Sequence, residues 1–206
     1  MTKLLHIEAS PRKSRSRSIE VAHEFINAYK TKHGSDAIET MDIWNMSLPP
    51  FNGDMLDAKY AVMSGTEPTE QQQTAWGSVQ KMFDHFNSAD TYLISVPMWN
   101  FNIPYQLKHY IDIITQPGMA WSYTPEEGYK GLLKNKTALV VYSSGDAYGQ
   151  GTGFEAYDLQ KPYINLWLNF IGITDIKTIN VEASLFPDRS NEEIAKQEAI
   201  KMIDQF

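Results

Sequence analysis

Short apolar stretches alternate with longer amphipathic ones along the chain, and this alternation limits the possible fold more than any other feature. The stretches 92–96 and 138–142 are apolar apart from Ser95, as is typical of strands buried on both faces of a sheet. Strands that alternate with helices predict βαβ units and a parallel sheet. Five strands are predicted, at 3–9, 37–43, 91–97, 137–143 and 176–182.

Five helices are predicted to follow these strands, at 17–33, 69–87, 104–116, 154–170 and 191–206. In the first, Ile19, Ala22 and Ile26 have the spacing of an amphipathic helix. Ser190 and Glu193 predict an N-cap and a capping box for the last. Together the five units predict a single α/β domain over 1–206, with a doubly wound sheet of order 2-1-3-4-5 and helices on both faces.

Composition excludes several kinds of chemistry. The chain of 206 residues has no cysteine, so disulfides, thiolate nucleophiles, cysteine-ligated zinc and iron–sulfur clusters are excluded, and redox chemistry requires a bound group. The formal net charge of −7 argues against general affinity for nucleic acid or acidic membranes. Because we recognise neither a bilayer-spanning apolar stretch nor a signal peptide, we expect a cytoplasmic protein without a membrane partner.

Ligands of such a sheet bind at the carboxyl ends of its strands, where three loops have distinctive sequences. The first, 9–18, reads ASPRKSRSRS and leads into a helix whose N-terminal N–H groups suit a phosphate. It matches neither a Walker loop nor a dinucleotide fingerprint. An ordinary serine N-cap beside a solvated basic loop explains the same residues.

The second loop, 97–104, reads PMWNFNIP and mixes aromatic with amide side chains, which suits a flat heteroaromatic ligand. Core aromatics with turn asparagines are the alternative. The third, 143–153, reads SSGDAYGQGTG, and its four glycines allow a ligand to approach the backbone, although a flexible linker has a similar composition. Two further segments, 44–68 and 117–131, are longer than the alternation requires, and such loops are usually functional or disordered.

The chain resembles the FMN-dependent NADH-azoreductase and NADH:quinone oxidoreductase family, whose members are flavodoxin-like homodimers. The resemblance covers essentially the whole sequence. It rests on Ser10 with the run Ser16-Arg17-Ser18, on PMWNFNIP with the following Gln106-Leu107-Lys108, on GLLKNKTALVVYSSG at 131–145 and on FIGIT at 170–174.

By this resemblance three groups of residues bind FMN. The FMN phosphate is held by Ser10, Ser16, Arg17 and Ser18. The flavin ring is lined by Pro97, Met98, Trp99, Asn100 and Phe101, with backbone N–H groups of the last two beside flavin N5. The opposite wall is formed by Ser143, Ser144, Gly145 and Asp146. Trp99 stands where the family usually has Tyr, and Asp146 where a second Gly is common, so the charge of Asp146 has no explanation in the resemblance.

The resemblance also implies a ping-pong reaction in which NADH, and then a quinone or azo compound, occupies the same place over FMN. Trp121 and Tyr123 are expected to line that pocket, in a homodimer whose site lies near the interface. Local packing within a hairpin explains the same two residues. The alternative function is an FMN electron carrier that does not oxidise NADH. A carrier needs an exposed flavin edge, whereas 44–68 and 117–131 are long enough to build a lid. We expect Arg12, Lys13 and Arg15 to supply a local field that attracts the anion.

Overall fold

The central feature of the fold is a parallel sheet. The structure is a computed structural model that describes residues 2–67, 69–186 and 188–206. Within these residues, five strands pair in the order β2-β1-β3-β6-β7, all parallel, as the sequence predicts. They are β1 (Leu4–Glu8), β2 (Ile38–Asp42), β3 (Thr91–Pro97), β6 (Thr137–Ser143) and β7 (Asp175–Val181).

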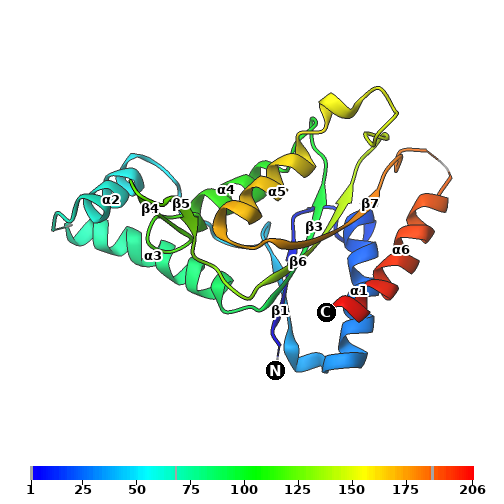
Figure 1. Cartoon of the computed structure of the whole chain (residues 1–206), viewed down its shortest axis with the longest axis horizontal. Helices are drawn as coiled ribbons and strands as arrows, with labels where there is room; N and C mark the ends of the chain where they lie inside the picture. The colour runs from blue at the N-terminus through cyan, green and yellow to red at the C-terminus, as the bar shows by residue number, and fades with distance from the viewer. Residues whose placement is uncertain (1, 68, 187) are drawn as a thin grey trace.

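Each face of the sheet has its own apolar core, because alternate residues of a strand point to opposite faces. Leu4 of β1 and Leu139 of β6 pack with α1 (Arg17–His33) and α6 (Ser190–Met202). Leu5 and Val140 instead pack with α3 (Glu70–Asn87), α4 (Tyr105–Ile114) and α5 (Gln160–Ile171). Figure 1 shows the two groups of helices on opposite sides of the strands.

Both long segments contain regular structure that the alternation does not predict. Residues 44–68 include α2 (Gly53–Ser64), which packs on α3, and 117–131 form a hairpin of β4 (Trp121–Thr124) and β5 (Gly128–Gly131). The side chain of Asn52 caps α2 by accepting the Met55 N–H, and a left-handed Gly65 ends it. Short 3-10 turns complete the fold: η1 (Lys13–Arg15), η2 (Ser35–Ala37), η3 (Glu155–Tyr157) and η4 (Ile203–Gln205).

Two predicted helix starts are wrong. The helix expected from residue 154 begins at Gln160, because the Asp158 carboxylate accepts the N–H groups of Gln160 and Lys161 (both 3.0 Å) and starts the helix there. Ser190 is the first residue of α6 rather than its cap, since its own N–H donates to Asp188 (2.8 Å). The capping box that does form joins Thr69 and Gln72 at the start of α3.

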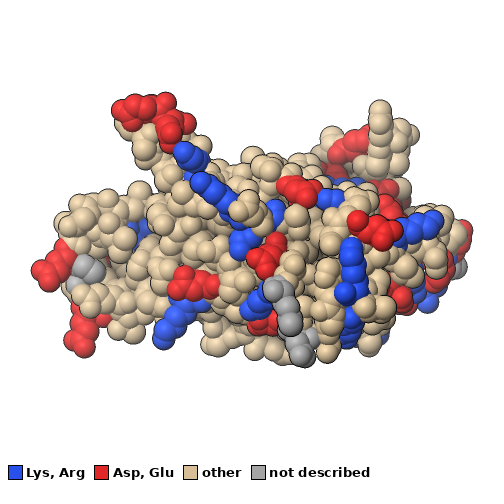
Figure 2. All heavy atoms as spheres, turned by 60° about the horizontal axis from the view of Figure 1, so that its bottom comes forward, with Lys and Arg blue, Asp and Glu red and all other residues tan. Residues whose placement is uncertain are grey.

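The parallel strands bring the first, second and third loops to one edge of the sheet. The Ala9 N–H donates to the Ser95 carbonyl (3.1 Å), and the Met98 N–H donates to the Ser143 carbonyl (2.7 Å). The first loop therefore begins beside β3, which leads into the second loop, and the second loop begins beside β6, which leads into the third. Among the described residues, no helix combines the length and apolar character needed to cross a membrane. Figure 2 shows acidic and basic side chains interspersed over one face of the molecule.

Candidate functional site

Buried hydroxyls and free backbone N–H groups meet where the first loop enters α1. Ser10, Ser16 and Ser18 are 1%, 3% and 0% exposed, and the Ser16 and Ser18 hydroxyls lie 3.3 Å apart. Ser16 is the N-cap residue of α1, yet its side chain makes no capping hydrogen bond. The first N–H groups of a helix have no partner within the helix, so this end of α1 is suited to bind an anion.

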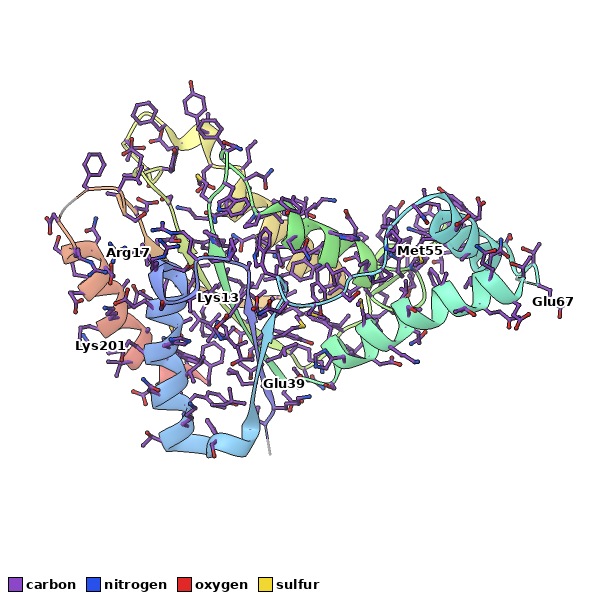
Figure 3. All side chains as sticks on the ribbon, turned by 180° about the vertical axis from the view of Figure 1, so that it is seen from behind. Lys13, Arg17, Glu39, Met55, Glu67 and Lys201 are labelled. Carbon is purple, nitrogen blue, oxygen red and sulfur yellow. The ribbon has the colours of Figure 1, made fainter. Side chains whose placement is uncertain are left out.

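The cations of the first loop are engaged in different ways. The guanidinium of Arg17 lies 2.7 Å from the buried carboxylate of Glu192 on α6, so its charge faces α6. The ammonium of Lys13 contacts the carboxylates of Glu8 and Asp42 at the ends of β1 and β2. Figure 3 shows Lys13 and Arg17 at the same end of α1. Arg12 and Arg15 are exposed and form no ion pair with the described residues.

The second loop contains a tight turn with unusual backbone geometry. Trp99 and Asn102 exchange two backbone hydrogen bonds (2.7 and 3.0 Å) across Asn100 and Phe101, whose φ angles are +46° and +71°. Two central residues with positive φ are the mark of a type I′ turn, which normally takes Asn or Gly. A phenylalanine in this conformation is strained, and such strain is concentrated at functional sites. The turn leaves Asn100 and Phe101 exposed.

Trp44 joins the first and second loops, and it is not among the site residues predicted from the sequence. Its indole N–H donates to the Ala9 carbonyl (3.0 Å), and its ring packs on Trp99 (5.4 Å between centroids) and on Tyr105 (5.3 Å). It lies just after β2, whose carboxyl end shares an edge with those of β1 and β3. Ligands of such a sheet bind at the carboxyl ends of its strands. Applied to the second predicted strand as well, this rule selects Trp44.

The third loop forms a second wall. Ser143 and Ser144 are buried, and the Ser144 hydroxyl donates to the Asp146 carbonyl (2.7 Å). The carboxylate of Asp146 accepts the N–H of Ala147 (2.8 Å) in a local turn, and the residue is exposed to solvent. The position of this carboxylate explains how an acidic residue is accommodated here.

Gly145 lies against the segment that follows β7. A Cβ added to Gly145 would come within 2.7 Å of the Leu185 side chain. The Leu185 N–H donates to the Gly145 carbonyl (3.2 Å), so the two segments are bonded together as well as packed. Because the Leu185 side chain is exposed and can turn aside, this contact favours glycine at position 145 but does not require it.

The second loop also contacts the segment that leads into α5. The Phe101 ring lies 5.5 Å from Tyr157 and 6.4 Å from Tyr148, and the Phe101 carbonyl accepts the Leu159 N–H (3.0 Å). Exposed aromatic rings therefore border the site on the side of the third loop. The hydrogen bond between the Phe101 carbonyl and the Leu159 N–H fixes the backbone that carries these rings. The rings therefore form a preformed apolar rim for a planar molecule.

Trp121 and Tyr123 are not brought to these loops within one chain. They lie on the β4–β5 hairpin, where Trp121 packs on Phe170 (5.8 Å) and Tyr123 is 57% exposed and packs on Tyr129 (4.9 Å). The hairpin packs on α5, and in Figure 1 it lies on the other side of the molecule from the yellow loop after β6. The thirteen predicted cofactor-binding residues thus share one edge, and the two predicted pocket residues do not.

A buried histidine and glutamate lie under the first loop. His6 is fully buried, its Nε2 lies 3.1 Å from the Ser95 hydroxyl, and burial lowers its pKa to about 4. Hydrogen bonding to His23, and then to Lys13, outweighs burial and lowers the pKa of Glu8 to about 2. Across 2–67, 69–186 and 188–206, no three His, Cys, Asp or Glu side chains are grouped to hold a metal ion.

Comparison with known proteins gives consistent results. A family model described as a flavodoxin-like fold matches residues 2–205. The chain is 46% identical to an FMN-dependent NADH:quinone oxidoreductase of Desulfotalea psychrophila, covering 98% of this chain and 96% of the relative. It is 39% identical to FMN-dependent NADH:quinone oxidoreductase 3 of Pseudomonas fluorescens, covering 100% and 97%.

Solved structures agree with these relatives. An azoreductase from Bacillus anthracis superposes with a TM-score of 0.90 at 28% identity, over 100% of both chains. An FMN-dependent NADH-azoreductase of the same species, solved in complex with FMN, superposes with a TM-score of 0.89 at 28% identity, over 100% of this chain and 99% of the other.

Proposed function

We propose, from the premise that the chain belongs to the family with the flavodoxin-like fold, that it is an FMN-dependent oxidoreductase that passes electrons from NADH to quinones and reductively cleaves azo compounds. The observation that carries the proposal is that three loops suited to bind a ligand meet at one edge of the five-stranded parallel sheet. One loop offers an anion site, one a strained turn with exposed rings, and one a glycine-rich wall.

The first loop fits the phosphate end of FMN. The hydroxyls of Ser16 and Ser18 are buried but bond only weakly to each other, and the adjoining helix end has free N–H groups. Ser10, Ser16 and Ser18 would bind the phosphate oxygens, with the N–H of Arg17 rather than its guanidinium. The proposed role of Arg17 is therefore carried by its backbone, since Glu192 occupies its side chain.

The second and third loops fit the flavin. Pro97, Met98 and Trp99 would support the ring system, and the turn would present the N–H groups of Asn100 and Phe101 to its edge. Ser143, Ser144, Gly145 and Asp146 would form the facing wall. Bound FMN would supply the two-electron hydride chemistry that links NADH to the acceptor. The residues orient the planar molecules, exclude water and supply N–H donors to the reduced ring.

We propose that NADH and the acceptor occupy the same pocket in turn, which gives ping-pong kinetics. The exposed rings of Phe101 and Tyr157 border the place where a nicotinamide or quinone would stack. The NADH requirement favours a cytoplasmic location.

A homodimer would bring Trp121 and Tyr123 to a site. Within one chain the hairpin lies far from the three loops, while Tyr123 and its neighbour Tyr129 are exposed. A cavity of about 500 Å³ beside the second loop adds further unfilled surface; its lining includes Phe51, Asn102, Tyr105 and Tyr163. A second copy that inserts its hairpin would cover such surface, so the pocket would be shared between two chains.

The experiment that tests the proposal uses the purified full chain. We expect flavin absorbance or tight reconstitution with FMN, NADH oxidation in the presence of a quinone, and parallel lines in double-reciprocal plots. A protein that cannot be reconstituted with FMN would refute the flavoprotein assignment. An FMN-loaded protein that NADH cannot reduce would instead identify the electron carrier.

A further inference from the structure

Lys13 has an unfavourable backbone conformation. Its φ of +50° lies in the left-handed region, which residues with a Cβ rarely adopt. It stands at the start of η1, the turn that leads into α1. A strained residue at this point needs an interaction that holds it in place.

The Lys13 side chain supplies that interaction. Its ammonium lies 3.1 Å from the Glu8 carboxylate and also contacts Asp42. Glu8 and Asp42 are paired across β1 and β2, so two like charges end neighbouring strands and Lys13 lies between them. The Glu8 side chain is 11% exposed and the Lys13 side chain 39%, so the pair is partly buried and solvent screens it less than a fully exposed pair.

The backbone of Lys13 connects this contact to the anion site. The Lys13 carbonyl accepts the N–H of Ser16 (2.8 Å), and the Ser16 carbonyl accepts the N–H of Glu20 (2.9 Å), the first link of α1. The position of the Lys13 peptide thus fixes Ser16 and, through it, the free N–H groups of the first turn.

We propose that Lys13 is a positioning residue: its ion pairs with Glu8 and Asp42 hold the left-handed turn that aims Ser16 and the first turn of α1 at the FMN phosphate. The proposal rests on the proposed function. It replaces the expectation that Lys13, like Arg12 and Arg15, acts as a field-generating charge, because two carboxylates already neutralise its ammonium.

A pair of variants at one position separates the two roles. Lys13→Met removes the ammonium and keeps a side chain that disfavours positive φ, whereas Lys13→Gly removes the ammonium and adopts positive φ freely. We expect Lys13→Met to raise the FMN dissociation constant about tenfold, and Lys13→Gly to raise it about threefold or less. The Lys13→Met ratio should be similar at about 50 mM and about 500 mM salt, unlike that of an Arg12→Met/Arg15→Met control.

Hydrogen exchange of the apoprotein gives a readout that does not require FMN. The Arg15 and Ser16 amides, both bonded within the turn, should exchange faster in Lys13→Met than in the parent chain. If Lys13→Met and Lys13→Gly weakened FMN binding equally, and the loss disappeared at high salt, the proposal would be overturned. Lys13 would then act through the electrostatic field of its charge. Unchanged affinity and exchange in both variants would also overturn it. If the parent chain does not bind FMN, the proposed function fails, while the exchange data still decide whether Lys13 holds the turn.

Discussion

Gly131, the last residue of β5, lies directly against Gly172 at the end of α5, and a Cβ added to Gly131 would come within 2.6 Å of the Gly172 Cα. The nearest atoms all belong to backbone, so no side chain can turn aside. We expect Gly131→Ala to lower the free energy of unfolding by about 1–3 kcal/mol. Gly77→Ala is the control, because Gly77 lies in α3 with nothing near the added Cβ, and alanine should raise the stability by up to about 1 kcal/mol. Urea unfolding measures both, and equal changes would contradict the close contact.

The Asn100 turn can be tested by two substitutions that remove the same amide side chain. Glycine adopts the φ of +46° without cost, whereas the β-branched side chain of valine strongly disfavours it. If the N–H groups of the turn bind the flavin, Asn100→Gly should keep FMN affinity within about threefold and Asn100→Val should weaken it about tenfold or more. Fluorescence quenching of FMN measures both constants. Equal losses in the two variants would assign the role to the Asn100 side chain instead.

The sequence predicts both ends of the two central strands, because strands buried on both faces of the sheet have continuous apolar sequences. Residues 92–96 and 138–142 are apolar apart from Ser95, and the predicted strands 91–97 and 137–143 match β3 and β6 residue for residue. By contrast, α2 buries only Met55 and Ala58, so its sequence has no apolar stripe from which a helix could be recognised. The position of α2 depends on its contacts with α3, which are formed by residues distant in the sequence.

Prediction of the candidate site has the same limits. The three loops are predictable because strand order alone brings their starts together. The partners of individual side chains are not: Trp44 meets Trp99, and Arg17 meets Glu192, across long separations in sequence. The resemblance assigns Arg17 to the phosphate by its position, and only the fold shows where its guanidinium points.

A substitution of Arg17 tests whether its backbone N–H or its guanidinium binds the FMN phosphate. Its guanidinium contacts Glu192, which also lies within ion-pair distance of Arg189 and Lys196. We expect Arg17→Met to lower the free energy of unfolding by about 1–2 kcal/mol while changing FMN affinity by less than about threefold. Thermal unfolding of the apoprotein and FMN titration measure the two effects separately. A large loss of affinity with unchanged stability would show that the guanidinium binds the phosphate.

His6 makes stability depend on pH in a defined window. Burial lowers its pKa from 6.5 to about 4, so between these values the unfolded chain binds a proton that the folded chain does not. The free energy of unfolding should therefore fall by about 3 kcal/mol as the pH drops from about 6.5 to about 4, and Glu8 should add its loss only below about 4.5. His6→Gln keeps a hydrogen-bonding group near Ser95 but does not titrate. Urea unfolding at several pH values should show a flatter profile for this variant, and identical profiles would exclude His6 as the cause.

A mixed dimer tests whether the β4–β5 hairpin serves its own chain or a second copy. In the proposed homodimer, Asn100→Val weakens FMN binding by the loops of one chain, and Tyr123→Ala removes a ring of the hairpin. Assayed at an FMN concentration well below the dissociation constant of Asn100→Val, each variant alone should therefore have strongly reduced NADH-dependent quinone reduction. If sites are shared, a heterodimer of the two variants contains one site with intact loops from the Tyr123→Ala chain and an intact hairpin from the Asn100→Val chain. Random reassociation makes half of the dimers mixed, so about a quarter of the parent activity should return.

If the hairpin acted on the loops of its own chain, every site would retain one defect and mixing would restore nothing. Mixing each variant with itself controls for the refolding step, and size-exclusion chromatography confirms that dimers re-form.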